Sequence, residues 1–452
     1  MNLLASLVIS LSSFIISYNF PFVLAMTAFG EDETEAGKSE SFYAEFHPEP
    51  LKITNDHTAY GEMEGFDYEV ERFMKRWGVK GASVAVVRDS ELLYTKGYGF
   101  ANEENGEVTQ PSHKFRIASV SKLVTAVAIM KLVEDQKLRL DQQVFGADGV
   151  LNDSIYLNYR DNKVEKITVS HLLTHSAGWS SRAGDPMFMD QVVAQWADKP
   201  LPLDVSDYIE YALNRRLSFY PGTRSIYSNL GFVVLGEVIA KASGMDYETY
   251  VQTNVLYPLG IYDMTLGHSL MDEIQEGEVT YYDKQNAAHR LSCFGTGDMV
   301  PRTYGGTHIE ALGAAGGWVA SVTDLMRLLT AIDGWDERED ILSPESIKTM
   351  TEPDPTYLSP MGWRSVNGLG RWWRTGTLAG TSAIMVRRAD GISYVMITNT
   401  STWKGSRFSR ELDLTVTRAL NRVNEWPETD LFEHETIPSL IPMPMQPVAS
   451  AN

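Results

Sequence analysis

Cysteine is almost absent from this chain. A single cysteine, Cys293, occurs among the 452 residues. One cysteine cannot form an intrachain disulfide, and it excludes a zinc site built from several thiolates. Cys293 stands in the stretch LSCFGTGD, where no basic neighbour lowers the pKa of a thiol. The pattern predicts a small packed side chain rather than a nucleophile.

Positive charge is also scarce. The 39 Lys and Arg residues face 59 Asp and Glu residues, which gives a net charge of −20. Such a chain repels nucleic-acid phosphates and anionic lipid headgroups. We therefore exclude nucleic acid as a partner. The chain also lacks a Gly-x-Ser-x-Gly motif, which disfavours an α/β-hydrolase.

Charged residues are missing from the first 30 positions, which contain no Asp, Glu, Lys or Arg. This segment predicts an export signal, with a cleavage context at 23–25, or an uncleaved anchor, because it is long enough to span a bilayer. We expect an exported protein, secreted or periplasmic, that touches a membrane only through this segment. Residues 31–63 are acidic and aperiodic and predict a linker, and the proline-rich residues 425–452 predict a tail without regular structure.

Residues 64–424 carry the patterns of a folded domain. Apolar residues at helical spacing predict helices at 66–77 and 408–423. Four β-like runs predict strands at 82–89, 91–101, 381–388 and 391–400, the last two joined by a turn at 389–391. Helical patterns and loops fill the middle. We expect an α+β fold with two lobes: an antiparallel sheet that pairs the early and late strands, flanked by the first and last helices, and a mostly helical lobe, with the site between them.

Two Ser-x-x-Lys pairs occur, Ser119/Lys122 and Ser401/Lys404, and about two are expected by chance. Only the first opens a strongly apolar helix, where residues i and i+3 share a face. A serine needs a base to become a nucleophile, and a lysine amine in a dry site can lose its charge and act as that base. The helix N-terminus offers N–H groups to an oxyanion. The alternative is a capping serine and a lysine that extends to water.

A second candidate motif is Tyr227-Ser228-Asn229. The phenol of Tyr227 could share the proton of Ser119, with its pKa lowered by Lys122. The alternative is structural: Ser228 or Asn229 caps the apolar helix that follows, and Tyr227 is an ordinary half-buried aromatic residue.

A third candidate motif is Arg374-Thr375-Gly376, just before a β-run. A cation at this position would hold a substrate carboxylate, and glycine at a strand edge lets a substrate approach closely. The N–H of Thr377 would complete an oxyanion hole. The alternative is a turn with a solvated arginine.

With SVSK at 119–122, YSN at 227–229 and RTG at 374–376, the chain resembles the serine β-lactamase and penicillin-binding-protein superfamily, in its class C-like branch. The stretches ITVSHLLTHSAGW, FYPGTRSIYSNLGFVVLGEVI and AAGGWVASVTDLMRLL are similar too. The resemblance implies the two-lobe β-lactamase-like fold. It also implies a serine hydrolase that acts through an acyl-enzyme on a D-amino-acid peptide, a small ester or a β-lactam-like compound.

The resemblance also implies residue roles. Ser119 is the acylated nucleophile, Lys122 and Tyr227 transfer protons, and Asn229 binds and positions the substrate. One departure concerns Arg374, because the family has Lys or His there. Arginine keeps its charge and cannot shuttle protons, so efficient β-lactam hydrolysis is not expected.

Other interpretations remain open. His171 and His175 have a zinc-binding spacing, but Leu172 stands where such a motif needs glutamate, so we expect neither a metal nor a cofactor. The same fold could be a non-catalytic or assembly-forming member of the family. It could also be an acyltransferase, because hydrolysis and transfer share one acyl-serine. The oligomeric state is open as well.

Overall fold

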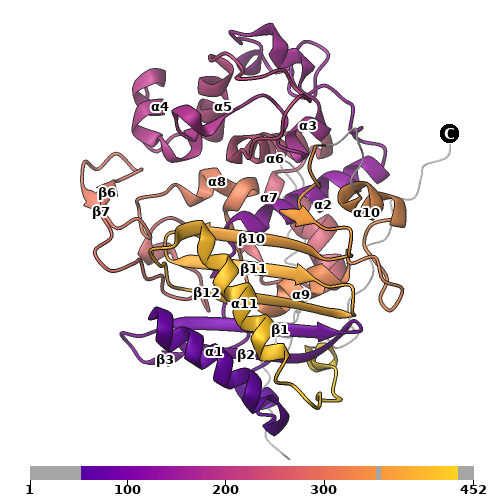
Figure 1. The fold of residues 1–452 in the computed structure, drawn as a ribbon. Coiled ribbons are helices and arrows are strands. Elements are labelled where there is room, and N and C mark those ends of the chain that lie inside the picture. The colour runs from indigo at the N-terminus through magenta and orange to yellow at the C-terminus, as the bar shows by residue number, and fades with distance from the viewer. Residues whose placement is uncertain (1–51, 353–357, 436–452) are drawn as a thin grey trace, which may run out of the picture. The chain divides into compact units, whose positions relative to one another are not determined.

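Seven antiparallel strands form the central sheet of the computed structural model, which describes residues 52–352 and 358–435 (Figure 1). The strands lie in the order β3–β2–β1–β12–β11–β10–β9. Their bounds are β1 Gly81–Arg88, β2 Glu91–Asn102, β3 Glu107–Val108, β9 Ser365–Val366, β10 Trp372–Leu378, β11 Thr381–Arg387 and β12 Ile392–Thr398. The predicted signal or anchor and most of the predicted linker lie outside the described residues.

The early and late strands pair as predicted. β1 pairs with β12, and Ala85 lies opposite Val395. β12 pairs in turn with β11, and the chain reverses between them through Gly391, whose φ of 81° suits glycine. The predicted antiparallel sheet and its late hairpin are therefore confirmed.

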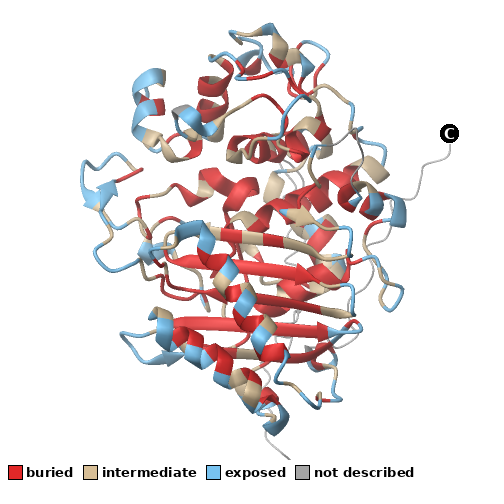
Figure 2. Ribbon diagram, viewed as in Figure 1, coloured by how far each residue is buried: buried red, intermediate tan, exposed pale blue. Residues whose placement is uncertain are grey.

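The first and last helices, α1 (Glu64–Trp77) and α11 (Ser409–Leu420), cover one face of the sheet (Figure 1). Figure 2 shows the exposed residues on their outer side and the buried strands beneath them. The rings of Phe73 and Phe408 stack at a centroid distance of 5.5 Å. Burial of apolar side chains such as Val84 of β1 between sheet and helices stabilises this layer.

The other face of the sheet belongs to a second, larger core. It contains Val124 of α2 (Ser121–Glu134), Leu325 of α9 (Val322–Thr330) and Val395 of β12. Because the sheet is covered on both faces, its central strands are buried along nearly their whole length, which explains their continuous apolar runs.

The middle of the chain forms the mostly helical lobe, seen above the sheet in Figure 1. Its helices are α3 Val169–Leu173, α4 Asp190–Ala197, α5 Val205–Leu213, α6 Asn229–Ser243, α7 Tyr247–Val251 and α8 Ile309–Gly316. Helix α10 (Pro344–Thr351) precedes β9.

Short strands also occur: β4 Phe115–Arg116, β8 Trp318–Ala320 and β5 Thr265–Leu266 form one small sheet, and β6 Arg290–Leu291 pairs with β7 Met299–Val300. The sequence did not predict these strands, because two or three residues carry no detectable period.

Regular structure occurs on both sides of the predicted domain limits. Short 3-10 helices at Asn55–Thr58 and Gly61–Met63 lie within the predicted linker. Another at Leu431–Glu435 lies within the predicted tail, and Leu431 and Phe432 are buried. The expectation that the tail lacks regular structure is therefore wrong at its inner end, and the predicted linker also contains regular structure at its inner end, whereas the limits 64 and 424 stay predictions.

Candidate active site

Ser119 lies in a 3-10 turn, Ala118–Val120, that directly precedes α2. The sequence predicted that Ser119 opens the α-helix itself. Ala118 instead has a φ of 49°, which is uncommon for a residue with a side chain. The N–H of Ile117 donates to the carbonyl of Trp318 at 3.0 Å, so the chain is fixed to β8 just before the turn. The serine therefore stands on a backbone whose conformation its surroundings hold in place.

Lys122 is buried completely, one turn beyond the serine. Its Nζ donates to Ser119 Oγ at 3.3 Å, to Asn229 Oδ1 at 2.8 Å and to the carbonyl of Ala315. Burial lowers the pKa of Lys122 to about 8, although its attraction to Tyr227 opposes that shift. The alternative of a lysine that extends to water is wrong, because the side chain is enclosed.

Tyr227 contacts the serine directly, with its hydroxyl 2.6 Å from Ser119 Oγ. Burial alone would raise the pKa of Tyr227, but the charges of Lys122 and Arg374 outweigh burial and bring it to about 8. The His175 ring packs against the phenol ring at a centroid distance of 4.6 Å. Tyr227 is therefore held against the serine and is not an ordinary half-buried aromatic residue.

The Tyr-Ser-Asn motif combines a helix cap with site residues. Ser228 caps α6, because its Oγ accepts a hydrogen bond from the N–H of Gly231 at 3.1 Å. Its neighbours face the serine: Tyr227 bonds Ser119, and Asn229 accepts from Lys122. The structural alternative is thus right for the middle residue, while the flanking residues reach the site.

Arg374 lies in β10 with its side chain buried, so the alternative of a solvated turn arginine is wrong. Its Nε donates to the carbonyl of Ser119 at 2.7 Å, and a terminal nitrogen donates to the Tyr227 hydroxyl at 3.3 Å. The guanidinium therefore links the turn Ala118–Val120 to the phenol of Tyr227. Its role as a ligand for a substrate carboxylate stays a prediction.

The rest of the third motif brings β10 against the backbone that leads into the Ser119 turn. A Cβ added at Gly376 would lie 2.1 Å from the carbonyl oxygen of Ile117, so glycine alone permits this approach. Thr375 and Thr377 flank it and are half-buried, and Thr377 Oγ1 donates to the Gly376 carbonyl at 2.8 Å. Substrate contacts of the two threonines stay predictions.

Two residues near the site were not predicted as site residues. Asp185 accepts from Asn229 Nδ2 at 2.7 Å and so orients the amide that faces Lys122. His175 is half-buried, its Nδ1 accepts from the N–H of Ser228 at 3.3 Å, and loss of contact with water holds its pKa well below the usual range. For His175, the only signal in the sequence was its spacing from His171. Asp185 stands in a loop without a motif, so nothing in the sequence marked it as a site residue.

Other polar candidates from the sequence have separate partners. Ser401 Oγ accepts from the N–H of Gly380 at 2.6 Å, while Lys404 bonds Glu411, so the second Ser-x-x-Lys pair does not form a couple. His171 Nδ1 lies 3.2 Å from the Lys166 carbonyl and does not converge with His175 on a shared ligand.

Cys293 is buried as predicted, and burial raises the pKa of its thiol to about 12. Its surroundings favour the neutral thiol, which is a poor nucleophile.

One group within residues 52–352 and 358–435 has the composition of a metal site. Ligand atoms of His268, Glu273 and Glu310 lie within 4.8 Å of one another. Glu310 already accepts hydrogen bonds from the N–H and the hydroxyl of Ser269. None of the three ligand residues belongs to the motifs around Ser119.

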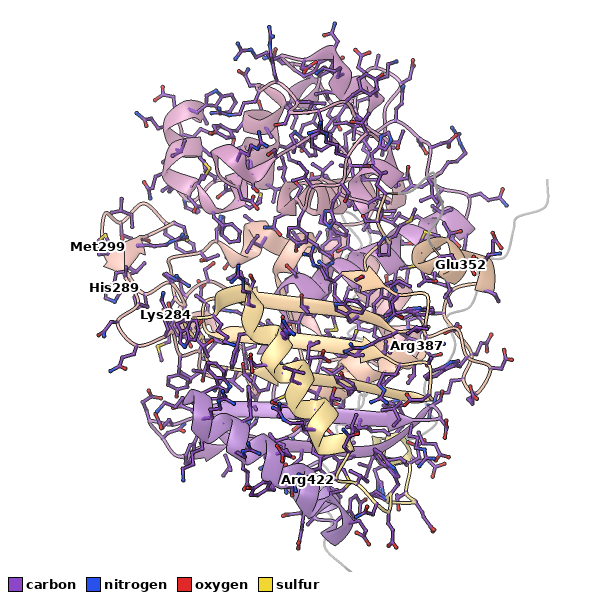
Figure 3. All side chains as sticks on the ribbon, viewed as in Figure 1. Lys284, His289, Met299, Glu352, Arg387 and Arg422 are labelled. Carbon is purple, nitrogen blue, oxygen red and sulfur yellow. The ribbon has the colours of Figure 1, made fainter. Side chains whose placement is uncertain are left out.

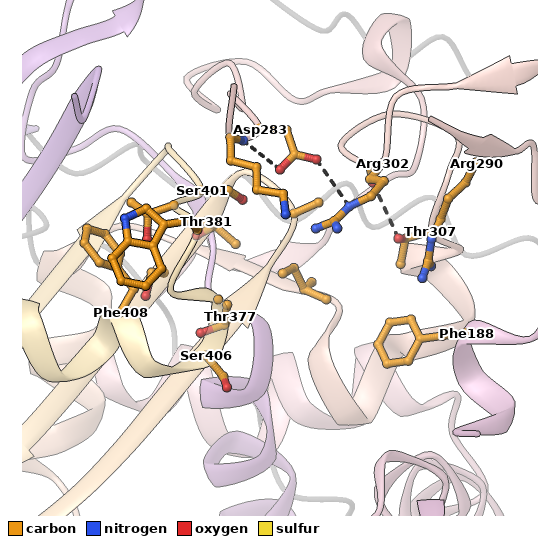
Figure 4. A pocket seen from close by; sticks show the side chains of 17 residues that line it. Phe188, Asp283, Arg290, Arg302, Thr307, Thr377, Thr381, Ser401, Ser406 and Phe408 are labelled. Atoms are coloured by element: carbon orange, nitrogen blue, oxygen red, sulfur yellow. Dashed lines mark hydrogen bonds and ion pairs between the residues drawn. The ribbon is translucent and has the colours of Figure 1, made fainter. Parts of the chain in front are cut away.

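Two pockets flank the serine cluster. Thr377 lines a pocket of about 380 Å³, shown in Figure 4, and Tyr227 lines another of about 360 Å³. A 3-10 turn, Pro186–Phe188, lies between them, because Pro186 lines the Tyr227 pocket and Phe188 lines the Thr377 pocket. The arrangement brings a hydroxyl, a phenol of lowered pKa and an enclosed amine together beside two pockets, a combination of groups that acyl transfer to serine uses.

Comparisons with known proteins agree with this geometry. The family model described as Beta-lactamase matches residues 66–417. The chain is 27% identical over 326 residues to Penicillin-binding protein 4* of Bacillus subtilis (strain 168), covering 68% of this chain and 65% of that protein. It is 29% identical over 214 residues to Esterase EstB of Burkholderia gladioli, covering 47% of this chain and 52% of that protein. The chain thus spans less than two thirds of the length of either relative.

A similar solved structure is that of the octameric penicillin-binding protein homologue from Pyrococcus abyssi. It is 26% identical, covers 80% of this chain and 78% of its own, and gives a TM-score of 0.57. Together with the family match, this similarity confirms the predicted α+β fold: an antiparallel sheet with flanking helices beside a mostly helical lobe.

Proposed function

Because the chain belongs to the Beta-lactamase family, whose model matches residues 66–417, we propose that it is a serine hydrolase that forms an acyl-enzyme at Ser119. The observation that carries this proposal is the contact of 2.6 Å between Ser119 Oγ and the Tyr227 hydroxyl, with Lys122 bonded to the same oxygen. The Tyr227 phenol comes from a residue 108 positions away from Ser119, and the Lys122 amine comes from a residue one helical turn away. Both groups lie within hydrogen-bond distance of Ser119 Oγ.

Acylation starts when Ser119 Oγ attacks the substrate carbonyl and loses its proton to the Tyr227–Lys122 pair. The carbonyl oxygen becomes an oxyanion, which the N–H groups of Ser119 and Thr377 stabilise. The bond to the leaving group then breaks, and the pair returns the proton to the leaving oxygen or nitrogen. Water repeats the sequence on the acyl-serine and releases the acid. Asn229 orients the substrate and keeps Lys122 in place.

The buried Arg374 of the third motif favours esters and open-chain amides over β-lactams, which are cyclic amides. Arg374 is bonded to Ser119 and Tyr227, which restricts its movement, and its guanidinium holds its proton too tightly to shuttle it. We expect turnover of small esters or D-amino-acid amides and little turnover of cephalosporins.

The proposal is tested with a fluorophosphonate probe, which labels activated serines. The wild type becomes labelled and Ser119→Ala does not, whereas Lys404→Ala, which removes the lysine of the second Ser-x-x-Lys pair, is labelled like the wild type. Labelling of Ser119→Ala at the wild-type rate would contradict the assignment. A panel of p-nitrophenyl esters, D-alanine p-nitroanilide and nitrocefin then identifies the substrate class, and rapid nitrocefin hydrolysis would overturn the expectation drawn from Arg374.

Acyl transfer uses the same acyl-serine, so the products are also analysed with an added alcohol. We propose hydrolysis, which predicts that free acid dominates in the presence of the alcohol. A product mixture dominated by the new ester would identify an acyltransferase.

We also propose that the protein works outside the cytoplasm, with residues 1–30 as export signal or anchor. The charge-free composition of that segment supports this. Within residues 52–352 and 358–435, no helix has both the length and the apolar character to cross a bilayer.

A further inference from the structure

The pocket beside Thr377 is lined from two sides (Figure 4). One side consists of the end of β10 and the loops around β11 and β12, which contribute hydroxyl groups: Thr377, Thr381, Ser401, Thr402 and Ser406. The opposite side is the segment that carries β6 and β7, which contributes Lys284, Arg290 and Arg302. Figure 3 shows Lys284, His289 and Met299 on this projecting segment.

The charge of this pocket is opposite to that of the chain. Three cations and one carboxylate line it, in a protein with a net charge of −20. Arg302 pairs with Asp283 at 3.2 Å, whereas Lys284 and Arg290 have no ion-pair partner among the residues that the structure describes. A cleft with excess charge of one sign concentrates ligands of the opposite sign.

In the proposed mechanism this pocket lies on the acyl side of the reaction centre. Beyond Trp373 the outer edge of β10 pairs with no strand among the described residues, so an extended acyl chain can follow this edge past Thr377. The leaving group receives its proton from Tyr227, and that residue lines the other pocket. The turn that carries Phe188 separates the two spaces.

We propose that this pocket binds a negatively charged group on the acyl part of the substrate. The natural substrates are then esters or amides of acyl groups that end in a carboxylate, such as a dicarboxylic acid or an acidic amino-acid residue. Lys284 and Arg290 hold the carboxylate, and the hydroxyls of Ser401 and Ser406, in the loop after β12, donate hydrogen bonds to it. This inference rests on the proposed acyl-enzyme at Ser119 and adds a substrate class to it.

The test compares two p-nitrophenyl esters that differ in one charge: the half ester of glutaric acid and the same ester with its far carboxylate methylated. The ratio of their kcat/KM values measures the preference for the anion. We expect the wild type to prefer the anionic ester, and the double variant Lys284→Ala/Arg290→Ala to lose about five- to tenfold of that ratio. Raising the salt concentration lowers the wild-type ratio as well, because these cations are screened by solvent ions.

A matched control removes two positive charges elsewhere, Arg139→Ala/Lys348→Ala, both on exposed side chains. It has the same net charge as the pocket variant and should keep the wild-type ratio. A wild-type ratio near one, or an equal change of the ratio in both double variants, overturns the inference. The proposed function still holds in that case, because the esters are hydrolysed. Absence of ester turnover and of probe labelling at Ser119 overturns the proposed function, and the inference with it.

Discussion

Lys122 and Tyr227 are the two residues proposed to accept the proton of Ser119. Burial lowers the pKa of Lys122 to about 8, and the neighbouring cations bring the pKa of Tyr227 to about 8 in spite of its burial. The pair therefore loses one proton close to neutral pH, and it does so as a coupled unit. A free lysine or tyrosine loses its proton about two units higher.

The activity should follow this titration. Below about pH 8 the pair holds the extra proton and cannot accept the proton of Ser119, so kcat/KM for a neutral ester rises with pH and levels above about 8. A pH–rate profile from pH 5 to 10 measures this. Lys122→Met should lose about 10²- to 10⁴-fold in kcat. A profile that stays flat across this range would argue against the pair as proton acceptor.

Arg374 should set the midpoint of that profile. Its charge lowers the pKa values of both Tyr227 and Lys122, so Arg374→Met should raise both and move the midpoint to higher pH. The control is Arg364→Met, because Arg364 also faces the Tyr227 ring, at 5.7 Å, but is exposed and screened by water. Equal shifts in the two variants would contradict the assignment, and melting temperatures show whether each variant is folded.

At the scale of elements, the close approach of β10 to the Ser119 turn should determine the position of Ser119 relative to that strand. Gly376→Ala would place a methyl group 2.1 Å from the Ile117 carbonyl and push the strand away from Ser119. We expect kcat/KM to fall by about 10²-fold, since a displacement of about 1 Å costs that much in a positioned site. Gly368→Ala, in the turn that leads into β10, meets no atom within 4 Å and should behave like the wild type. A Gly376→Ala enzyme with full activity would show that this contact is dispensable.

The sequence predicted some elements well and missed others for physical reasons. β11 and β12 were predicted from apolar runs around a glycine turn. β10 was not, because its stretch WWRTGTL mixes a buried arginine, polar residues and glycine without a period of two. The 3-10 turn at Ser119 was also missed, since its conformation comes from contacts with β8 and not from local propensity.

At the scale of the whole molecule, three motifs far apart in sequence converge where the sheet meets the helical lobe. Their order allowed the cluster of Ser119, Lys122 and Tyr227 to be predicted from a family resemblance. The supporting contacts of Asp185 and His175 could not be predicted, because a long-range contact leaves no pattern around either partner. The net negative charge excluded nucleic acid as a partner. It could not indicate the local positive charge beside Thr377, because that charge gathers only when the chain folds.

The tail beyond residue 424 should stabilise the whole domain. Phe432 is buried, and its ring lies 4.8 Å and 4.7 Å from the guanidinium carbons of Arg327 and Arg338. Phe432→Ala should lower the free energy of unfolding by about 3–5 kcal/mol, the cost of removing a buried aromatic ring. Glu428→Ala, on an exposed position of the same segment, should change it by less than about 0.5 kcal/mol. Urea unfolding of both variants measures the difference, and equal stabilities would show that the tail does not contribute to the core.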